Sequence, residues 1–404
     1  MQRSGLLSPL KERDFARLWT GQVVSDAGEW VNYVALTSLV WDMTGSAWML
    51  AVLRACHAVP LLVLGPFAGV FVDRWNRKTT MVVVDILRAG MVALFPFAHD
   101  IATILAITLA FNTVSVFFTP AKNSIIPQIV SPDRLLPANS LSSTTRNMAQ
   151  VVGPAVGGFI LTIGGTAAAF YFNSATFLFA GVAILSMQAP GVRARGTREG
   201  VSATQELREG FRFASSRPPV RSALLLEIGL ALGWGSVNVL AIVIAEQMLG
   251  GGPTEYGLLL TSMGLGSVAG AIVIGWAGGR MGVGNILMAG FLLMGVFTAG
   301  LASSPVVLTA AASYFLIAVG RAFIDVTATT IYQRSVPDSL LGRIFALRYM
   351  TTHLMLLISN QIAGLFTDAA SLVPLFVAAA ALEILCALSS RLLVSAFSQR
   401  VFQR

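Results

Sequence analysis

The chain has 404 residues, of which 55% are hydrophobic and only 11% are charged, and its formal net charge is +8. Soluble domains carry about 25% charged residues, so this composition excludes an ordinary water-soluble protein. Twelve apolar runs are long enough to cross a bilayer as helices, whereas barrel strands would be about half as long. In chain order the predicted spans cover about 15–41, 46–72, 79–98, 101–126, 138–163, 166–188, 221–247, 255–278, 284–303, 306–333, 341–366 and 371–393.

The basic residues are sorted between the loops. Those outside the spans precede the first span or follow an even-numbered one: Arg74, Arg77 and Lys78 follow the second span, and Lys122 and Arg134 flank the turn after the fourth. The positive-inside rule therefore predicts that both termini lie in the cytoplasm of a bacterial cell. Membrane orientation explains the positive charge better than nucleic-acid binding does. The opposite loops contain no Lys or Arg and carry Asp42, Asp100, Glu246, Glu255 and Asp368.

The two halves of the chain resemble each other. Gln128, Pro132, Asp133, Leu135 and Leu136 recur 205 positions later as Gln333, Pro337, Asp338, Leu340 and Leu341. This repeat predicts two parallel six-helix bundles that enclose a cavity near the middle of the membrane. The expected parts are a cytoplasmic N-terminus (1–14), two bundles (15–188 and 221–393), a linker with an amphipathic surface helix (189–220) and a cytoplasmic tail (394–404).

The loop after the second span carries a recognisable motif. A glycine stands four residues before an Asp-Arg pair, and a basic pair follows, giving Gly69, Asp73, Arg74, Arg77 and Lys78. This spacing resembles the signature loop of the major facilitator superfamily, with Asn76 in place of the usual glycine. The resemblance implies an all-α fold of twelve membrane helices in two pseudo-symmetric bundles. It also implies that these residues latch one conformation on the cytoplasmic side; an ordinary positive-inside loop is the alternative.

A second motif lies in the fifth span, where Gly153, Pro154, Gly157 and Gly158 resemble the antiporter motif of the same superfamily. Simple helix packing by small residues is the alternative interpretation. The arginine that proton-driven drug antiporters commonly carry in span four has no counterpart in 101–121. The segments at 25–30, 132–139 and 256–259 resemble the enterobactin-exporter and macrolide-efflux branch, the transmembrane secretion effectors.

Polar residues recur at helical spacing on four spans that the resemblance assigns to the cavity. An ionised group at mid-membrane costs about 2.5–3.5 kcal/mol on insertion scales, so such residues normally face water or a partner. The candidate cavity residues are Gln22, Asp26, Glu29, Trp30 and Tyr33 on span one, Asn112 on span four, Glu227 and Asn238 on span seven, and Arg321 and Asp325 on span ten.

Asp26 and Glu29 are the candidates for proton binding and release, or for attracting a cationic substrate. Mutual repulsion and desolvation in a poorly hydrated cavity would favour a proton on one of them near neutral pH. The alternative is structural pairing with Arg54 or Arg88.

Other charges inside spans are expected to be structural or remain open. Asp85 and Arg88 can pair with each other, as can Arg321 and Asp325, which also lie on a cavity span. Arg146 and Gln150 share a face of span five, as do Arg348, Thr352 and Ser359 on span eleven, and either set would contact substrate or bridge the bundles. Glu383 on span twelve is expected to be a feature of packing.

The function predicted from these features is secondary transport, with export of an amphiphilic small molecule by alternating access in exchange for protons. The expected partners are the small-molecule substrate, protons and the lipid bilayer; no nucleic acid, cofactor or metal is expected, and the chain is expected to be monomeric. No Walker-type phosphate loop or catalytic motif occurs, which argues against an enzyme. A lysophospholipid flippase on the same fold and a non-transporting membrane sensor or scaffold are the alternatives.

Overall fold

The structure is a computed structural model that describes residues 7–189, 203–277, 281–304, 306–369 and 372–401. Helices account for almost all of these residues, and no strand occurs among them. The chain divides into two compact units, one formed by Met1–Gly45 and Ala55–Glu199 and the other by Ser46–Arg54 and Gly200–Arg404. The first turns of α2 therefore group with the second unit.

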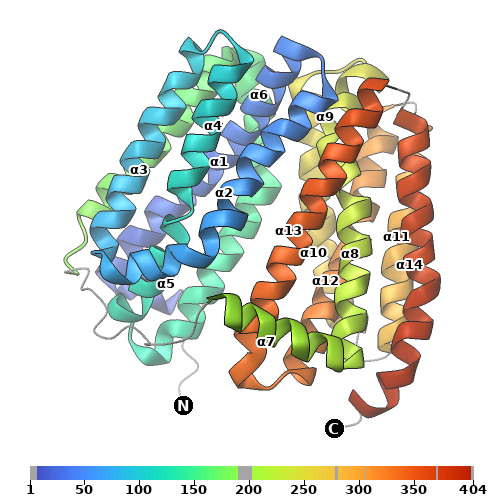
Figure 1. The fold of residues 1–404 in the computed structure, drawn as a ribbon. Coiled ribbons are helices and arrows are strands. Elements are labelled where there is room, and N and C mark those ends of the chain that lie inside the picture. Colours follow the sequence, from blue (N-terminus) through green and yellow to red (C-terminus); the bar gives the residue numbers. More distant parts are fainter. Residues whose placement is uncertain (1–6, 190–202, 278–280, 305, 370–371, 402–404) are drawn as a thin grey trace. The chain divides into compact units, whose positions relative to one another are not determined.

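The helices of the first half of the chain are shown in Figure 1. Three single turns, η1 (Ser8–Lys11), η2 (Phe95–Phe97) and η3 (Pro132–Arg134), stand between or before them. The helices are α1 (Arg13–Thr44), α2 (Ala47–Arg74), α3 (Arg77–Leu94), α4 (Ile101–Ser115), α5 (Phe118–Ile129) and α6 (Leu135–Leu185).

Local chemistry fixes where several helices begin and end. Gly45 follows α1 with φ 56°, a left-handed conformation that suits glycine, and its N–H donates to the Trp41 carbonyl over 2.7 Å. Asn76 precedes α3 and its Oδ1 accepts from the Thr79 N–H at 3.0 Å. Asp100 caps α4 in the same way. The asparagine that departs from the signature motif is thus the cap of the third span.

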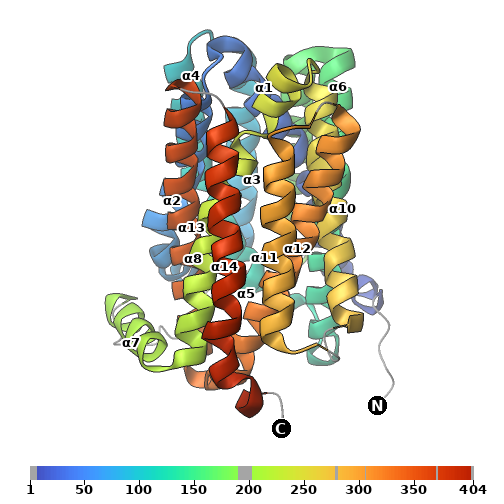
Figure 2. The same ribbon diagram turned by 90° about the vertical axis from the view of Figure 1, so that its right-hand side faces the viewer.

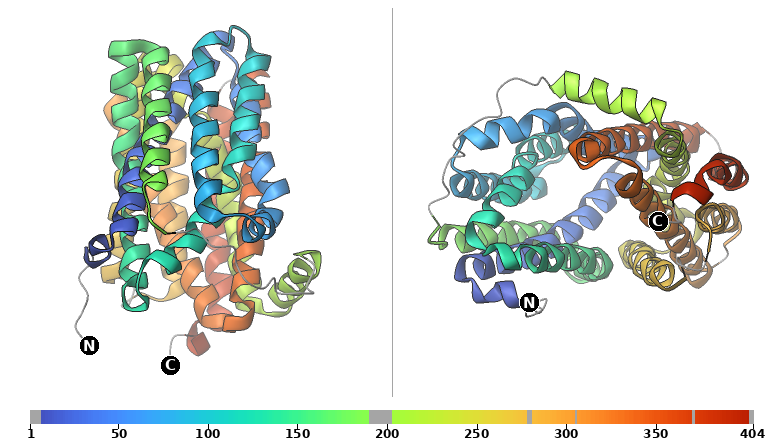
Figure 3. Two further views of the ribbon diagram at one scale, coloured as in Figure 1. Left: turned by 90° about the vertical axis from the view of Figure 1, so that its left-hand side faces the viewer. Right: turned by 90° about the horizontal axis from the view of Figure 1, so that it is seen from below.

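Three predicted spans have a different shape in the structure. The fourth, expected at 101–126, is broken at Val116 and Phe117 into α4 and α5. The fifth and sixth are joined in α6, where Gly165 has φ 72° and ψ −179° and the chain turns back (Figure 3, left). A residue with a Cβ rarely adopts this conformation, so Gly165 separates two helices within α6.

The second half of the chain contains α7 (Ala203–Ser216), which lies across the ends of the longer helices of its unit (Figure 1). Figure 2 shows α11, α12 and α14 side by side. The remaining elements are α8 (Pro218–Val239), α9 (Ala241–Val243), the single π-helical turn η4 (Ile244–Met248), α10 (Pro253–Ala277), α11 (Val283–Leu301), α12 (Val307–Ser335), α13 (Asp338–Ala369) and α14 (Leu372–Val401).

Nine helical segments among the described residues are long and apolar enough to cross a membrane, and one of these includes the whole of α6. With α6 counted as two helices and the more polar α1 and α13 included, the described part of the chain provides twelve long segments. This agrees with the predicted span number, and the all-α fold class is confirmed.

Candidate functional site

The first unit contains a cavity of about 340 Å³. Polar side chains from four helices surround it, which is unusual for apolar helices of this length. The lining residues are Gln22, Ser25, Asp26, Glu29 and Trp30 from α1, Arg88 from α3, Phe118, Thr119 and Lys122 from α5, and Arg146, Asn147 and Gln150 from α6.

The predicted stripe on α1 contributes most of one wall. Gln22, Asp26, Glu29 and Trp30 all line the cavity, because positions three and four apart share one face of a helix. Tyr33 continues the stripe outside the lining, and its ring lies 5.3 Å from that of Trp30.

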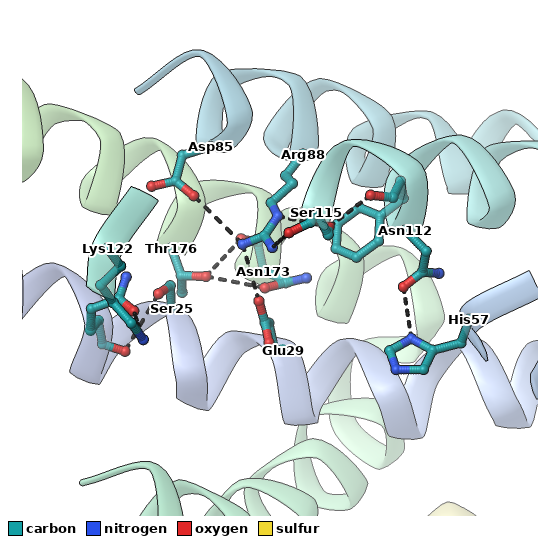
Figure 4. A network of polar contacts seen from close by, with 12 residues as sticks. Ser25, Glu29, His57, Asp85, Arg88, Asn112, Ser115, Lys122, Asn173 and Thr176 are labelled. Atoms are coloured by element: carbon teal, nitrogen blue, oxygen red, sulfur yellow. Dashed lines mark hydrogen bonds and ion pairs between the residues drawn. The ribbon is translucent and has the colours of Figure 1, made fainter. Parts of the chain in front are cut away.

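Arg88 is the centre of the polar network on the opposite wall (Figure 4). Its Nη1 lies 3.3 Å from Glu29 Oε1 and 3.7 Å from Asp85 Oδ1. The Arg88 side chain is 9% exposed and that of Asp85 1%, whereas Glu29 is 45% exposed. Arg88 therefore pairs with a buried carboxylate on its own helix and with a cavity carboxylate on α1, so both pairings considered for it are present.

Arg88 also forms hydrogen bonds with the C-terminal end of α4. Its Nε donates to Ser115 Oγ at 2.8 Å, and its Nη2 donates to the Ser115 carbonyl at 3.4 Å. Ser115 is the last residue of α4, where carbonyls lack partners within the helix. The rings of Phe111, Phe118 and Phe177 pack around the guanidinium at 4.9–5.7 Å, which favours a cation.

Lys122 is a cavity residue, and its predicted place beside a cytoplasmic turn is wrong. It lies within α5, is 7% exposed, and donates from Nζ to Gln22 Oε1 over 3.1 Å. The break at Val116 and Phe117 starts a new helix here, so Lys122 points from its third-last turn into the unit instead of emerging at a span end. Sequence spacing measured along one unbroken span could not reveal this.

Asn112, a predicted cavity residue, lies elsewhere. Its side chain is buried, and its Oδ1 lies 2.7 Å from His57 Nδ1 (Figure 4). Its Nδ2 donates to the Thr108 carbonyl of its own helix. Asn112 is not among the residues that line the 340 Å³ cavity.

The second unit holds a separate charged cluster around Glu227 on α8. Glu227 is 3% exposed, and its Oε1 accepts from Arg348 Nε of α13 at 2.7 Å. Its Oε2 accepts from the hydroxyl of Tyr332 on α12 at 2.7 Å. Arg348 also donates to Thr329 Oγ1 at 2.9 Å and pairs with Asp325. The cluster thus joins α8, α12 and α13.

The remaining predicted residues of this unit have different surroundings. Asp325 forms an ion pair with Arg348 and also interacts electrostatically with Arg321, so the local pair that was considered for Arg321 and Asp325 is not the shortest contact of Asp325. The Arg321 guanidinium lies 4.5 Å from the centre of the Trp234 ring. Asn238 is half-buried on α8. Arg348 is the common partner of Glu227 and Asp325. Sequence spacing could not show this, because the three residues lie on three different helices.

The signature loop is partly described. Gly69 and Asp73 lie on α2, and the side chain of Asp73 is outside the described set. Arg74 ends α2 and is exposed. Arg77 is buried and donates to the Ser124 carbonyl of α5 at 3.0 Å, while Lys78 donates to the Met187 carbonyl at 2.6 Å. These two cations fasten the start of α3 to neighbouring segments of the first unit.

The antiporter-like motif lies on α6 and packs against the cavity stripe. A Cβ on Gly153 would stand 2.4 Å from Trp30 Cβ, and one on Gly157 would stand 3.1 Å from Val31 Cα. Pro154 and Gly158 are buried in the same stretch. The small residues therefore let α6 approach α1 closely at the turn that carries Trp30.

The sequence did not single out Lys122 or Asn147 as cavity residues. Arg146 and Gln150 were considered for substrate contact or for bridging the bundles because they share a helix face, and both line the cavity. Three cations and two carboxylates line it, and Asp85 behind Arg88 balances the formal charge. Among the described residues no group of three or more His, Cys, Asp or Glu could hold a metal ion.

Comparison with known proteins adds the family. A family model described as transmembrane secretion effector matches residues 4–401. Macrolide efflux protein A of Streptococcus pyogenes is 22% identical over 361 residues, covering 88% of this chain and 89% of that protein. The putative bacilysin exporter BacE of Bacillus amyloliquefaciens is 26% identical over 356 residues, covering 87% and 88%.

The fold has known counterparts among solved structures. A bacterial homolog of the human lysosomal transporter Spinster superposes with a TM-score of 0.68 at 14% identity, covering 96% of each chain. At this identity the likeness concerns the fold alone.

Proposed function

Because the chain belongs to the transmembrane secretion effector family of the major facilitator superfamily, we propose that it exports an amphiphilic small molecule in exchange for protons. It is a multi-pass membrane protein of an efflux family. The observation that supports the finer proposal is the cavity of the first unit, in which two acidic side chains of α1 face three basic ones.

Asp26 is the proposed exchange site. It lines the cavity, and none of the described hydrogen bonds or ion pairs engages its carboxylate. Lys122 beside it is already bonded to Gln22, and Arg88 is bonded to Ser115 and paired with Glu29. A proton or a cationic group of the substrate would each neutralise Asp26, so the two compete for one site. Such competition is the basis of exchange.

Glu29 is proposed to respond to the same event. Its ion pair with Arg88 is half-exposed to the cavity, while the Asp85–Arg88 contact is buried. Protonation of Glu29 would break its ion pair with Arg88. Arg88 would then stay paired with Asp85 alone, and the Glu29 side chain would no longer be held at the cavity wall. The alternating access that exports the substrate is part of the proposal, as are cytoplasmic termini, a monomeric state and a latch formed by Gly69, Asp73, Arg74, Arg77 and Lys78.

The test uses the full chain in proteoliposomes with a pH-sensitive dye inside. A macrolide added outside should drive proton movement, and Asp26→Asn and Glu29→Gln should abolish it. Asp42→Asn, at the far end of the same helix and outside the cavity lining, is the matched control. Proton movement that persists in both cavity variants would overturn the assignment.

The rivals give different results in the same vesicles. A flippase would move a fluorescent lysophospholipid between leaflets without a macrolide-driven proton signal. A sensor or scaffold would give neither signal. For the latch, Asp73→Asn should reduce transport while the protein stays folded in the membrane, and unchanged transport would refute that role.

A further inference from the structure

Glu383 on α14 is an isolated carboxyl in the interior of the second unit. It is 0% exposed. Neither carboxyl oxygen has a hydrogen-bond partner among the described residues. The Glu227 cluster does not include it, since that carboxylate is bonded to Arg348 and Tyr332.

Three helices enclose this carboxyl with small or weakly polar groups. A Cβ on Gly233 of α8 would stand 2.6 Å from Glu383 Oε1, so α8 passes directly against it. The hydroxyl of Thr298 on α11 is the polar group beside this carboxyl; it is fully buried and forms no hydrogen bond of ordinary geometry among the described residues. Gly295, also on α11, packs against Ala380 and Ile384 on either side of Glu383.

The ionisable groups on these helices do not offer a counter-charge. On α8 the charged residues are Arg221, near its start, and Glu227, which is already paired. Helix α11 carries no ionisable side chain. On α13, which also packs against α14, Arg343 is paired with Glu209 and Arg348 with Glu227. On α14 the described ionisable neighbour is the Cys386 thiol, three residues along.

An ionised carboxylate would be costly at this position. Burial removes the water that would solvate its charge, no partner among the described residues compensates for that loss, and lipid supplies no water to do so. A neutral carboxylic acid carries no charge. After a small rotation its O–H or C=O can form a hydrogen bond with the adjacent Thr298 hydroxyl. The geometry therefore favours the protonated form.

We propose that Glu383 is a proton-binding site of the second unit, in addition to Asp26 and Glu29 of the first. Its carboxyl holds a proton while α8, α11 and α14 pack as they do here, and gives the proton up when α8 moves away at Gly233 and water reaches the oxygen atoms. This assignment stands on the burial of Glu383 and does not depend on which substrate is exported.

The test is infrared spectroscopy of the full chain in lipid bilayers. An ordinary glutamate is ionised above a pH of about 4.3, so a protonated-carboxyl stretching band at pH 7 that Glu383→Gln removes is the expected result. Glu255→Gln should leave that band intact, because Glu255 is partly exposed and accepts from the Gly252 N–H. An equal band in wild type and Glu383→Gln would overturn the proposal, whether or not macrolide transport is observed.

A second variant covers the case in which Glu383→Gln does not fold. Gly233→Ala retains the acid and adds a methyl group against it, so the band should shift in frequency. Gly300→Ala on α11 is the control, since its nearest neighbour would be 3.7 Å away. A band that is unchanged in Gly233→Ala would contradict the assignment.

Discussion

Lys122 on α5 donates a 3.1 Å hydrogen bond to the neutral amide oxygen of Gln22 on α1, although the lysine is 7% exposed and two carboxylates line the same cavity. The positive charge of Lys122 is therefore not consumed by a single ion pair. It contributes to the field of the whole cavity, where it offsets Asp26 and Glu29. The cavity that receives the substrate therefore has no large excess of positive or negative charge.

Replacing Lys122 should change which substrates are preferred. Lys122→Met makes the formal charge of the cavity more negative by one, so export of cationic ethidium should gain over export of an anionic dye by about 1 kcal/mol, or roughly fivefold. The ratio of the two efflux rates from loaded cells measures this. Lys11→Met, on the exposed turn η1, should leave the ratio unchanged.

Breaking the Glu227 cluster should destabilise the second unit. Arg348→Met leaves Glu227 buried without its cation, and the expected loss of unfolding free energy is about 3–5 kcal/mol. The double variant Glu227→Gln with Arg348→Met should recover most of this loss, because no buried charge remains. Thermal unfolding in detergent measures both.

The matched control for this cluster is the more exposed pair of Arg343 and Glu209. Arg343→Met should cost no more than about 1 kcal/mol. If Arg343→Met and Arg348→Met lower the melting temperature equally, burial is not what makes the Glu227 cluster important.

Gly153 should tolerate no side chain. The Cβ of Gly153→Ala would come within 2.4 Å of Trp30 Cβ, so α6 must move away from α1 at the cavity wall. Transport should fall by roughly tenfold or more, since a misplacement of about 1 Å at a site can cost 10²-fold. Gly90→Ala meets nothing within 4 Å on α3 and should be neutral or slightly stabilising.

Asp100 should make the start of α4 sensitive to acid. The Thr103 hydroxyl and the backbone N–H groups that donate to its carboxylate lower the pKa of Asp100. A lowered pKa means that the cap stabilises α4 at neutral pH and that this stabilisation is lost as the pH falls below about 4. Hydrogen exchange in the first turn of α4 should accelerate there. Asp100→Asn, which keeps a capping side chain, should show no such acceleration.

Sequence reasoning found the parts of the site that lie on one continuous helix. The stripe of Gln22, Asp26, Glu29 and Trp30 follows from helical periodicity alone. Lys122 and Arg348 were not recognised as partners of Gln22 and Glu227, because each pair is more than 90 residues apart and only the packing of helices brings it together. The spans were predictable from apolar length, whereas the break at Val116 and Phe117 carries no strong sequence signal.

The Arg88 guanidinium, which is hydrogen-bonded to Ser115, also lies in the cavity wall beside Glu29. A substrate that draws Arg88 toward itself would take it from the terminal carbonyl of α4. Occupancy would then loosen the joint between α4 and α5 at the same moment. Binding in the cavity and movement of α4 relative to α5 are therefore coupled through the side chain of Arg88.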